Sequence, residues 1–287
     1  MNENTYNLLE SQENIVSQLA NLIYQKFYIN TTKLNLKKEN LIMKLKKANK
    51  SKITLHRGFK IDFILTNGNL IAQKDDFKIL VEPGQYILLE NVEPRLNQKI
   101  IIHKPHEIYE SENDFYFIYG TTLSDDFDEA KLRIYFNLNP NGVPLFVESI
   151  TTLFNKNNIP FTLKCLYETQ KYGRSDSCVL YFDKRYFSDF KHIWKVIYLK
   201  IEKYLNSKIP LFTLKIQSGV GLAENPKLNK SFGKERCLLI AKGIFMSFYE
   251  DIPNEDKHQF VLKYIATQGF DIDSFYLNPN SPFRYEL

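Results

Sequence analysis

The chain has 287 residues, of which 44% are hydrophobic and 25% are charged, and its net charge is +5. These values are typical of one large globular domain or two modest ones, and they exclude wholesale disorder and collagen-like repeats. The charge excess is milder than that of most nucleic-acid-binding proteins, so we expect no nucleic-acid partner. The sequence has neither an apolar run of about 18 residues nor a basic segment followed by an apolar core. We therefore expect a cytoplasmic protein with no membrane partner.

The first hundred residues predict helices followed by short strands. Apolar residues recur at helical spacing near the N-terminus, and residues 38–50 form a second helical stretch whose basic end predicts a solvated helix face. From residue 53 to residue 90 the pattern alternates, and Asn67-Gly68 is a hairpin signal. The polar stretch 91–98 and the acidic stretch 124–130 are candidate boundaries. We predict an N-terminal helical and short-strand region over 1–100, suited to docking a peptide or partner, and a second domain over 101–287.

The second region alternates regularly between strands and helices. The expected strands are 115–120, 131–138, 160–167, 177–182 and 210–216, and the expected helices begin near residues 143, 190, 232 and 256. No GxGxxG or GxxxxGKS turn joins a strand to a helix, so the nucleotide-binding fingerprints are absent. The pattern predicts an α+β fold: an antiparallel or mixed sheet with helices packed on one face and a polar, cationic cleft on the other.

Polar side chains alternate with apolar ones along three of these strands. The tetrapeptide FTLK occurs twice, at 161–164 and 212–215, so Thr162 and Lys164 share one side of a strand, as do Thr213 and Lys215. The strand at 131–138 divides in the same way, with a polar side of Arg133, Tyr135 and Asn137. If these strands are neighbours, their polar side is a cationic cleft. The alternative is an ordinary half-exposed sheet wetted by lysines.

The turn YGRSDS at 172–177 brings three functional side chain types together. Tyr172, Arg174 and Asp176 lie in a loop between two strands, where rigid scaffolds commonly carry functional groups.

The segment SFGKER at 231–236 predicts the start of a helix. Ser231 suits the N-cap, and free backbone N–H groups at that position favour an anion. Arg236 lies in the first turns, where the helix dipole gives a cation no advantage. Either a nearby anion or a salt bridge to Glu235 or Glu224 explains it.

The cysteines and histidines give no metal-binding pattern. The three cysteines form no CxxC pair and predict a reducing compartment. His103 and His106 flank Pro105 on an extended segment, which places them on opposite sides, so we expect no metal site. The other three histidines stand alone and are expected to be structural.

Several blocks in the second region resemble one family. These blocks, in chain order, are LRIYFNL, IPFTLKCLYETQKYGRSDSCVLYF, IPLFTLKIQSGVGLAENP, SFGKERCLLIAKGI and YLNPNS. Together they resemble the HopA-like type III effector family, which includes the lyase components of class V lanthipeptide biosynthesis. The resemblance covers about residues 115–280.

This resemblance implies β-elimination of phosphate from phosphoserine or phosphothreonine in a precursor peptide, which leaves dehydroalanine or dehydrobutyrine. A separate kinase-like protein would install the phosphate, and no metal or cofactor is needed. The implied setting is the bacterial cytoplasm, and secretion as an effector stays open. A lysine is a suitable base when burial and neighbouring cations depress its pKa.

The residue types fit this chemistry in the following roles. Lys164 is the expected base, and either Lys215 or Tyr172 would stabilise the enolate-like transition state. Asp176 and Glu224 would orient the arginines, while Tyr172 or a histidine would be the general acid. The expected phosphate-binding residues are Arg133, Arg174, Arg236 and Ser231.

Two other functions fit parts of the sequence. The effector branch of the family makes a non-catalytic protein that binds a host or partner protein a serious alternative. A cationic, aromatic-rich face also suits a nucleic-acid or phosphoinositide binder.

Overall fold

The computed structural model describes residues 3–29, 31, 35–90, 92–109, 114–124, 131–226 and 231–286, with side chains from residue 12 onward. The acidic boundary expected at 124–130 lies outside these residues except for Ser124. Within the described ranges, no helix is both long enough and apolar enough to cross a bilayer.

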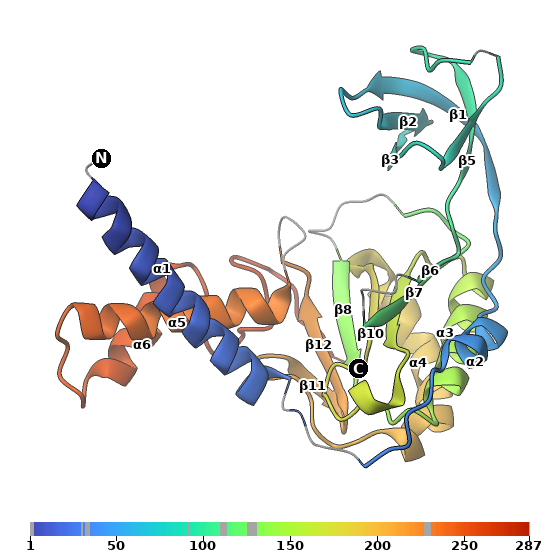
Figure 1. Cartoon of the computed structure of the whole chain (residues 1–287). Coiled ribbons are helices and arrows are strands. Elements are labelled where there is room, and N and C mark those ends of the chain that lie inside the picture. Colours follow the sequence, from blue (N-terminus) through green and yellow to red (C-terminus); the bar gives the residue numbers. More distant parts are fainter. Residues whose placement is uncertain are drawn as a thin grey trace.

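The larger of two sheets has seven strands, and every pair of neighbours in it is antiparallel (Figure 1). This arrangement, with helices on its faces, confirms the predicted α+β fold. In spatial order the strands are β11 (Leu214–Gln217), β12 (Val220–Glu224), β8 (Lys131–Phe136), β10 (Cys178–Asp183), β9 (Thr162–Leu166), β7 (Phe115–Tyr119) and β6 (Glu107–Tyr109).

One face of this sheet carries the main core. The even positions of β8, from Leu132 to Phe136, lie on this face as their alternation predicted, and they are fully buried. Two helices cover them, α3 (Val143–Lys156) and α4 (Phe187–Ile201), with a short helix α2 (Ile42–Ala48) beside α3 (Figure 1). Their apolar stripes supply the packing partners that the strands need.

The sequence predicted a polar, cationic cleft on the opposite face. In the structure, two further helices cover part of this face. These are α1 (Glu3–Ile23), which continues as a π-helical turn at Tyr24–Tyr28, and α5 (Phe232–Tyr249), with α6 (Lys257–Thr267) packed on α5. The cause is a second apolar cluster in which Tyr135, Val179 and Ala223 of the sheet are buried against these helices.

Gly233 allows this close packing. A Cβ atom at this position would lie 2.3 Å from a ring carbon of the buried Tyr28, which is a severe steric clash. Only glycine therefore lets the start of α5 approach the end of the first helix.

The smaller sheet has five antiparallel strands and its own apolar core. In spatial order they are β3 (Phe77–Val81), β2 (Leu70–Lys74), β1 (Leu55–Ile64), β5 (Lys99–His103) and β4 (Tyr86–Leu88). The predicted hairpin at Asn67-Gly68 joins β1 to β2, with Gly68 at a φ of +83°. The smaller sheet is formed by residues 55–103, whereas the helices that precede it in the chain pack against elements of the larger sheet and its helices (Figure 1).

Candidate functional site

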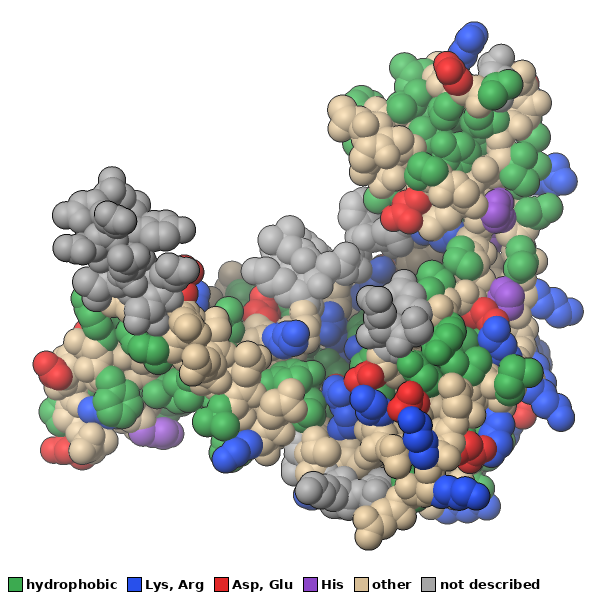
Figure 2. Space-filling model, in the orientation of Figure 1, with side chains coloured by type: hydrophobic (Ala, Val, Ile, Leu, Met, Phe, Trp, Pro, Cys, Tyr) green, Lys and Arg blue, Asp and Glu red, His purple; other side chains and the backbone are tan. Residues whose placement is uncertain are grey.

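Strand order brings basic side chains together on the second face of the larger sheet. β10 lies between β8 and β9, so Tyr181 pairs with Arg133 on one side and with Thr162 on the other. Lys164 is two residues beyond Thr162 and therefore lies on the same face. Figure 2 shows Lys and Arg side chains gathered in the hollow between the α1/α5 helices and the rest of the molecule.

Two aromatic rings link three cations on this face. The Tyr181 ring centroid lies 5.2 Å from the Arg133 guanidinium carbon and 5.9 Å from the Lys164 amino nitrogen. The Phe115 centroid lies 4.4 Å from the same Lys164 nitrogen and 5.6 Å from the Arg174 guanidinium carbon. We call Arg133, Tyr181, Lys164, Phe115 and Arg174 the cationic row. Cation–π contacts hold these charges close to one another although they repel.

Asp176 fixes the end of the cationic row. Its two carboxylate oxygens accept hydrogen bonds from Nε and Nη2 of Arg174, at 2.7 and 2.9 Å. Burial alone lowers the pKa of Arg174, but the hydrogen bonds and charge of Asp176 outweigh it and raise that pKa above its ordinary value. The guanidinium therefore stays charged, and its remaining N–H groups keep a fixed direction.

Lys164 differs from the arginines in its surroundings. It is half-buried, and no carboxylate among the described residues forms an ion pair with its amino group. Arg133 is more enclosed: only 8% of its surface is exposed, and its Nε donates a hydrogen bond to Asn225. The row thus combines two anchored guanidinium groups with one amine that, among the described residues, contacts aromatic rings and no carboxylate.

Helix α5 begins beside the row. Ser231 is its N-cap residue, as predicted, but its hydroxyl makes no capping hydrogen bond. The next residue, Phe232, packs against Tyr135, which lies two residues from Arg133 on the same face of β8. The start of this 18-residue helix therefore lies against the same face of the sheet, and the first N–H groups of a helix favour an anion.

Buried phenols line the covered part of this face. Burial, with the charge of Asp176 adding to it, raises the pKa of Tyr24, and burial also raises the pKa of Tyr28 and Tyr135. These side chains therefore remain neutral hydrogen-bond donors at physiological pH.

Arg236 does not belong to the cationic row, contrary to its predicted role in binding phosphate. It is fully buried, and it donates hydrogen bonds to the carbonyls of Phe275 and Leu277, at 3.0 and 2.9 Å, and to Glu235. Its guanidinium is also enclosed by the rings of Phe232, Phe270 and Phe275. The unusual cation in the first turns of α5 therefore anchors the C-terminal segment.

Glu224 also anchors the C-terminal segment, and it orients a lysine rather than an arginine. It lies on the main-core face, opposite Leu132, and is fully buried. Its carboxylate accepts hydrogen bonds from Lys184 Nζ at 3.2 Å, Ser281 Oγ at 2.7 Å, Tyr285 Oη at 2.8 Å and the backbone N–H of Asn278 at 2.8 Å.

We expect the substitution Glu224→Gln to destabilise the fold by about 2 kcal/mol, because Lys184 and three further donors lose a charged acceptor. Urea unfolding followed by circular dichroism measures this. The matched control is Glu148→Gln, which breaks an exposed ion pair with Lys50 and is expected to cost less than about 1 kcal/mol. Equal effects of the two substitutions would contradict the anchoring role.

Two further predicted site residues lie away from the row. The Tyr172 hydroxyl donates a 2.6 Å hydrogen bond to the Leu166 carbonyl within the main core, so the phenol has no path to a substrate on the second face. Lys215 is exposed on the edge strand β11, four strands from Lys164, which corresponds to roughly 19 Å. The FTLK repeat therefore does not place two lysines in one site.

The described residues offer no cluster of three or more His, Cys, Asp or Glu side chains that could hold a metal. All three cysteines are free and buried, and Cys165 and Cys178 lie opposite each other on β9 and β10 within the main core.

Sequence reasoning did not find the two rings of the row. Tyr181 shares its side of β10 with Val179 and Asp183, so the alternation of this strand gives only a weak signal for it. Phe115 carries no comparable signal, because its contacts depend on β7 being the neighbour of β9.

The fold and the site define an α+β protein whose antiparallel sheet carries a cationic row on a partly open face. The chain belongs to the HopA1 effector protein family, which it matches over residues 108–277. The matched region contains all five members of the row and confirms the resemblance noted in the sequence.

Solved effector structures are similar in fold. The effector protein from Pseudomonas syringae pv. syringae strain 61 has a TM-score of 0.52 at 14% identity, with 94% of this chain and 98% of that chain covered. The effector protein from Pseudomonas syringae pv. tomato strain DC3000 has a TM-score of 0.47 at 16% identity, with coverages of 60% and 66%. The chain thus spans less than two thirds of the latter's length. A search of curated protein sequences finds no match.

Proposed function

We propose that the chain is a phosphoserine/phosphothreonine lyase that eliminates phosphate from a precursor peptide. One observation carries this proposal. In the cationic row the Lys164 amine lies between two guanidinium groups, and no carboxylate among the described residues forms an ion pair with it. A phosphate ester needs guanidinium groups to bind it, and β-elimination needs a base near its Cα proton.

Lys164 is the base in this proposal. Its neutral amine takes the Cα proton, the C–H electron pair forms the Cα=Cβ bond, and the Cβ–O bond breaks to release phosphate. Cations on both sides stabilise the negative charge that develops in the transition state.

Arg133 and Arg174 bind the phosphate before and after the bond breaks. Asp176 holds Arg174 in one orientation, so little side-chain entropy is lost when phosphate binds. The exposed Ser231 hydroxyl and the first N–H groups of α5 offer further donors beside Arg133.

The proposal is tested with synthetic peptides that contain one phosphoserine or phosphothreonine. We expect the mass of the peptide to fall by one phosphoric acid, and the product to add a thiol, which identifies a dehydroamino acid. Phosphopeptide binding without any change in mass would overturn the lyase and support the non-catalytic, partner-binding alternative. Release of phosphate with regeneration of serine would indicate a phosphatase instead.

A further inference from the structure

The end of the first helix is fastened to the turn that carries Arg174 and Asp176. Just after the π-helical turn, the Ile29 carbonyl accepts one hydrogen bond from the backbone N–H of Ser175 and another from its hydroxyl, both at 3.0 Å. The same hydroxyl donates a longer hydrogen bond, of 3.3 Å, to the Tyr28 carbonyl. Ser175 stands between Arg174 and Asp176 in the chain and is fully enclosed. These contacts hold the helix end against the Arg174 end of the cationic row.

This fastening brings the phenol of Tyr24 close to Arg174. The half-buried Tyr24 ring stacks on the buried Tyr28 ring, with centroids 5.1 Å apart and planes inclined by 18°. Tyr24 begins the π-helical turn, and turns of this kind are frequent at functional sites. Burial and then the charge of Asp176 raise the pKa of Tyr24, while the charge of Arg174 lowers it, which agrees with a phenol close to that ion pair.

Tyr24 and Arg174 both have donors that no described residue uses. The Tyr24 hydroxyl has no hydrogen-bond partner in the described part of the chain. Asp176 takes Nε and Nη2 of Arg174, whereas Nη1 donates to none of the described side chains or carbonyls. A phosphate presents acceptor oxygens in several directions, so one phosphate can accept from a neutral phenol and from a guanidinium at the same time.

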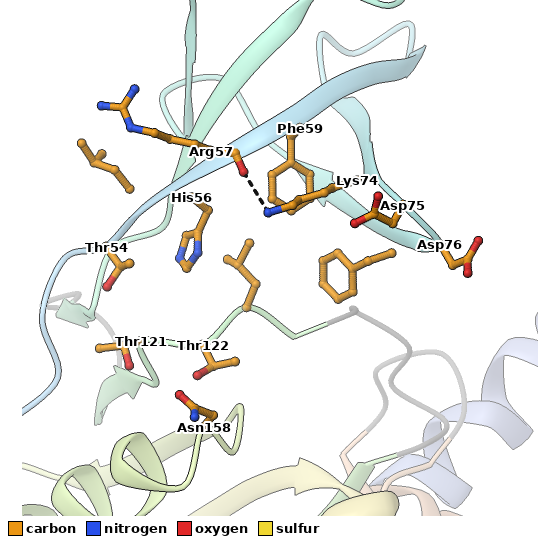
Figure 3. A pocket seen from close by; sticks show the side chains of 13 residues that line it. Thr54, His56, Arg57, Phe59, Lys74, Asp75, Asp76, Thr121, Thr122 and Asn158 are labelled. Atoms are coloured by element: carbon orange, nitrogen blue, oxygen red, sulfur yellow. Dashed lines mark hydrogen bonds between the residues drawn. The ribbon is translucent and has the colours of Figure 1, made fainter.

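A cavity of about 930 Å³ beside the smaller sheet is a less suitable phosphate site. Its lining combines Arg57 and Lys74 with Asp75 and Asp76, which lie on the turn between β2 and β3 (Figure 3). Lys74 there donates a hydrogen bond to the Arg57 carbonyl at 3.3 Å. The two carboxylates offset the two cations, whereas the cationic row has three cations and one carboxylate bound at its end. A phosphate is therefore favoured at the row.

We propose that Tyr24 is a further phosphate-binding residue, whose hydroxyl donates a hydrogen bond to an oxygen of the phosphate that Arg174 binds. This assignment rests on the proposed function, because it takes the phosphate ester to lie at the row. It makes the N-terminal helix part of the site, although this helix lies outside the family match over 108–277.

The experiment measures the affinity of a fluorescein-labelled peptide that carries a phosphonate analogue of phosphoserine, with a methylene group in place of the ester oxygen. This analogue has no ester bond for β-elimination to break, so fluorescence anisotropy reports binding at equilibrium whether or not the chain is a lyase. Tyr24→Phe removes only the hydroxyl and keeps the ring that stacks on Tyr28. We expect it to bind the phosphonate peptide at least about tenfold more weakly, which is a usual effect of losing a hydrogen bond to a charged group.

The matched control is Tyr198→Phe, which should bind the phosphonate peptide as the native chain does. Tyr198 is a half-buried tyrosine of α4, on the other side of the sheet, and its ring centroid lies 5.5 Å from that of Trp194. Urea unfolding without ligand should give Tyr24→Phe the native stability, because its hydroxyl has no described partner to lose. The stabilisation that the phosphonate peptide adds should be smaller for Tyr24→Phe than for the native chain.

The outcomes separate this proposal from the lyase. Weaker phosphonate binding by Tyr24→Phe with native stability supports the role of Tyr24 even if no phosphoserine peptide is eliminated. Equal affinity of Tyr24→Phe and the native chain would overturn that role, and it would leave the elimination reaction unaffected. The role is also wrong if Tyr24→Phe binds the corresponding unmodified serine peptide more weakly by the same factor, because Tyr24 would then contact the peptide and not its phosphonate.

Discussion

Replacing Lys164 by alanine should reduce the rate of phosphate elimination by about 10²–10⁴-fold, because a positioned general base contributes rate enhancement of this size. The side chain also contacts the rings of Phe115 and Tyr181, so its loss frees both rings. Single-turnover kinetics with a phosphopeptide measure the chemical step directly, and mass spectrometry follows the loss of phosphoric acid.

The variant Lys164→Arg separates a base from a simple charge. Arginine keeps the positive charge and the cation–π contacts, but its guanidinium does not deprotonate under these conditions. We expect elimination to fall as far as in Lys164→Ala while phosphopeptide binding stays within a few-fold of the native chain. The control Lys191→Ala changes an exposed lysine of α4 and should leave both elimination and phosphopeptide binding unchanged. Near-native elimination by Lys164→Arg would remove Lys164 as the base.

The substitution Arg236→Met should destabilise the fold by about 3–5 kcal/mol, which is the usual cost of removing one partner from a buried charged network. Arg236 is fully buried, and its loss leaves the carbonyls of Phe275 and Leu277 without their donors. Methionine retains much of the side-chain volume, so the measured change reports on polar contacts rather than on a cavity. Urea unfolding followed by fluorescence measures the difference.

The matched control for Arg236→Met is Arg185→Met, because the Arg185 side chain is 53% exposed, although its partner Asp183 is buried. We expect this control to cost clearly less than Arg236→Met, because its guanidinium is already largely in contact with water. Kinetics distinguish the anchoring role from phosphate binding: folded Arg236→Met should keep the native KM for a phosphopeptide, whereas Arg174→Met should raise it. A raised KM of Arg236→Met together with unchanged stability would instead support Arg236 as a phosphate-binding residue.

The sequence determined the local features of this protein. Strand alternation placed Arg133 and Lys164 on the polar sides of β8 and β9, and the apolar stripe with its N-cap located α5 at Phe232–Tyr249. These features follow from periods of two and 3.6 residues, which a single chain segment displays without its partners. The family resemblance was visible for the same reason, because its blocks are local patterns.

Only the tertiary structure decided which polar side chains share a site. The order β8-β10-β9-β7 puts the rings of Tyr181 and Phe115 between cations from separate segments of the chain, and strand order is a long-range property that periodicity does not encode. Burial decided the role of Arg236, which lies against backbone carbonyls about forty residues further along the chain. Because this guanidinium is removed from water, the fold requires the hydrogen bonds that it donates to them. A charged residue in sequence has no fixed role until its distant partners are in place.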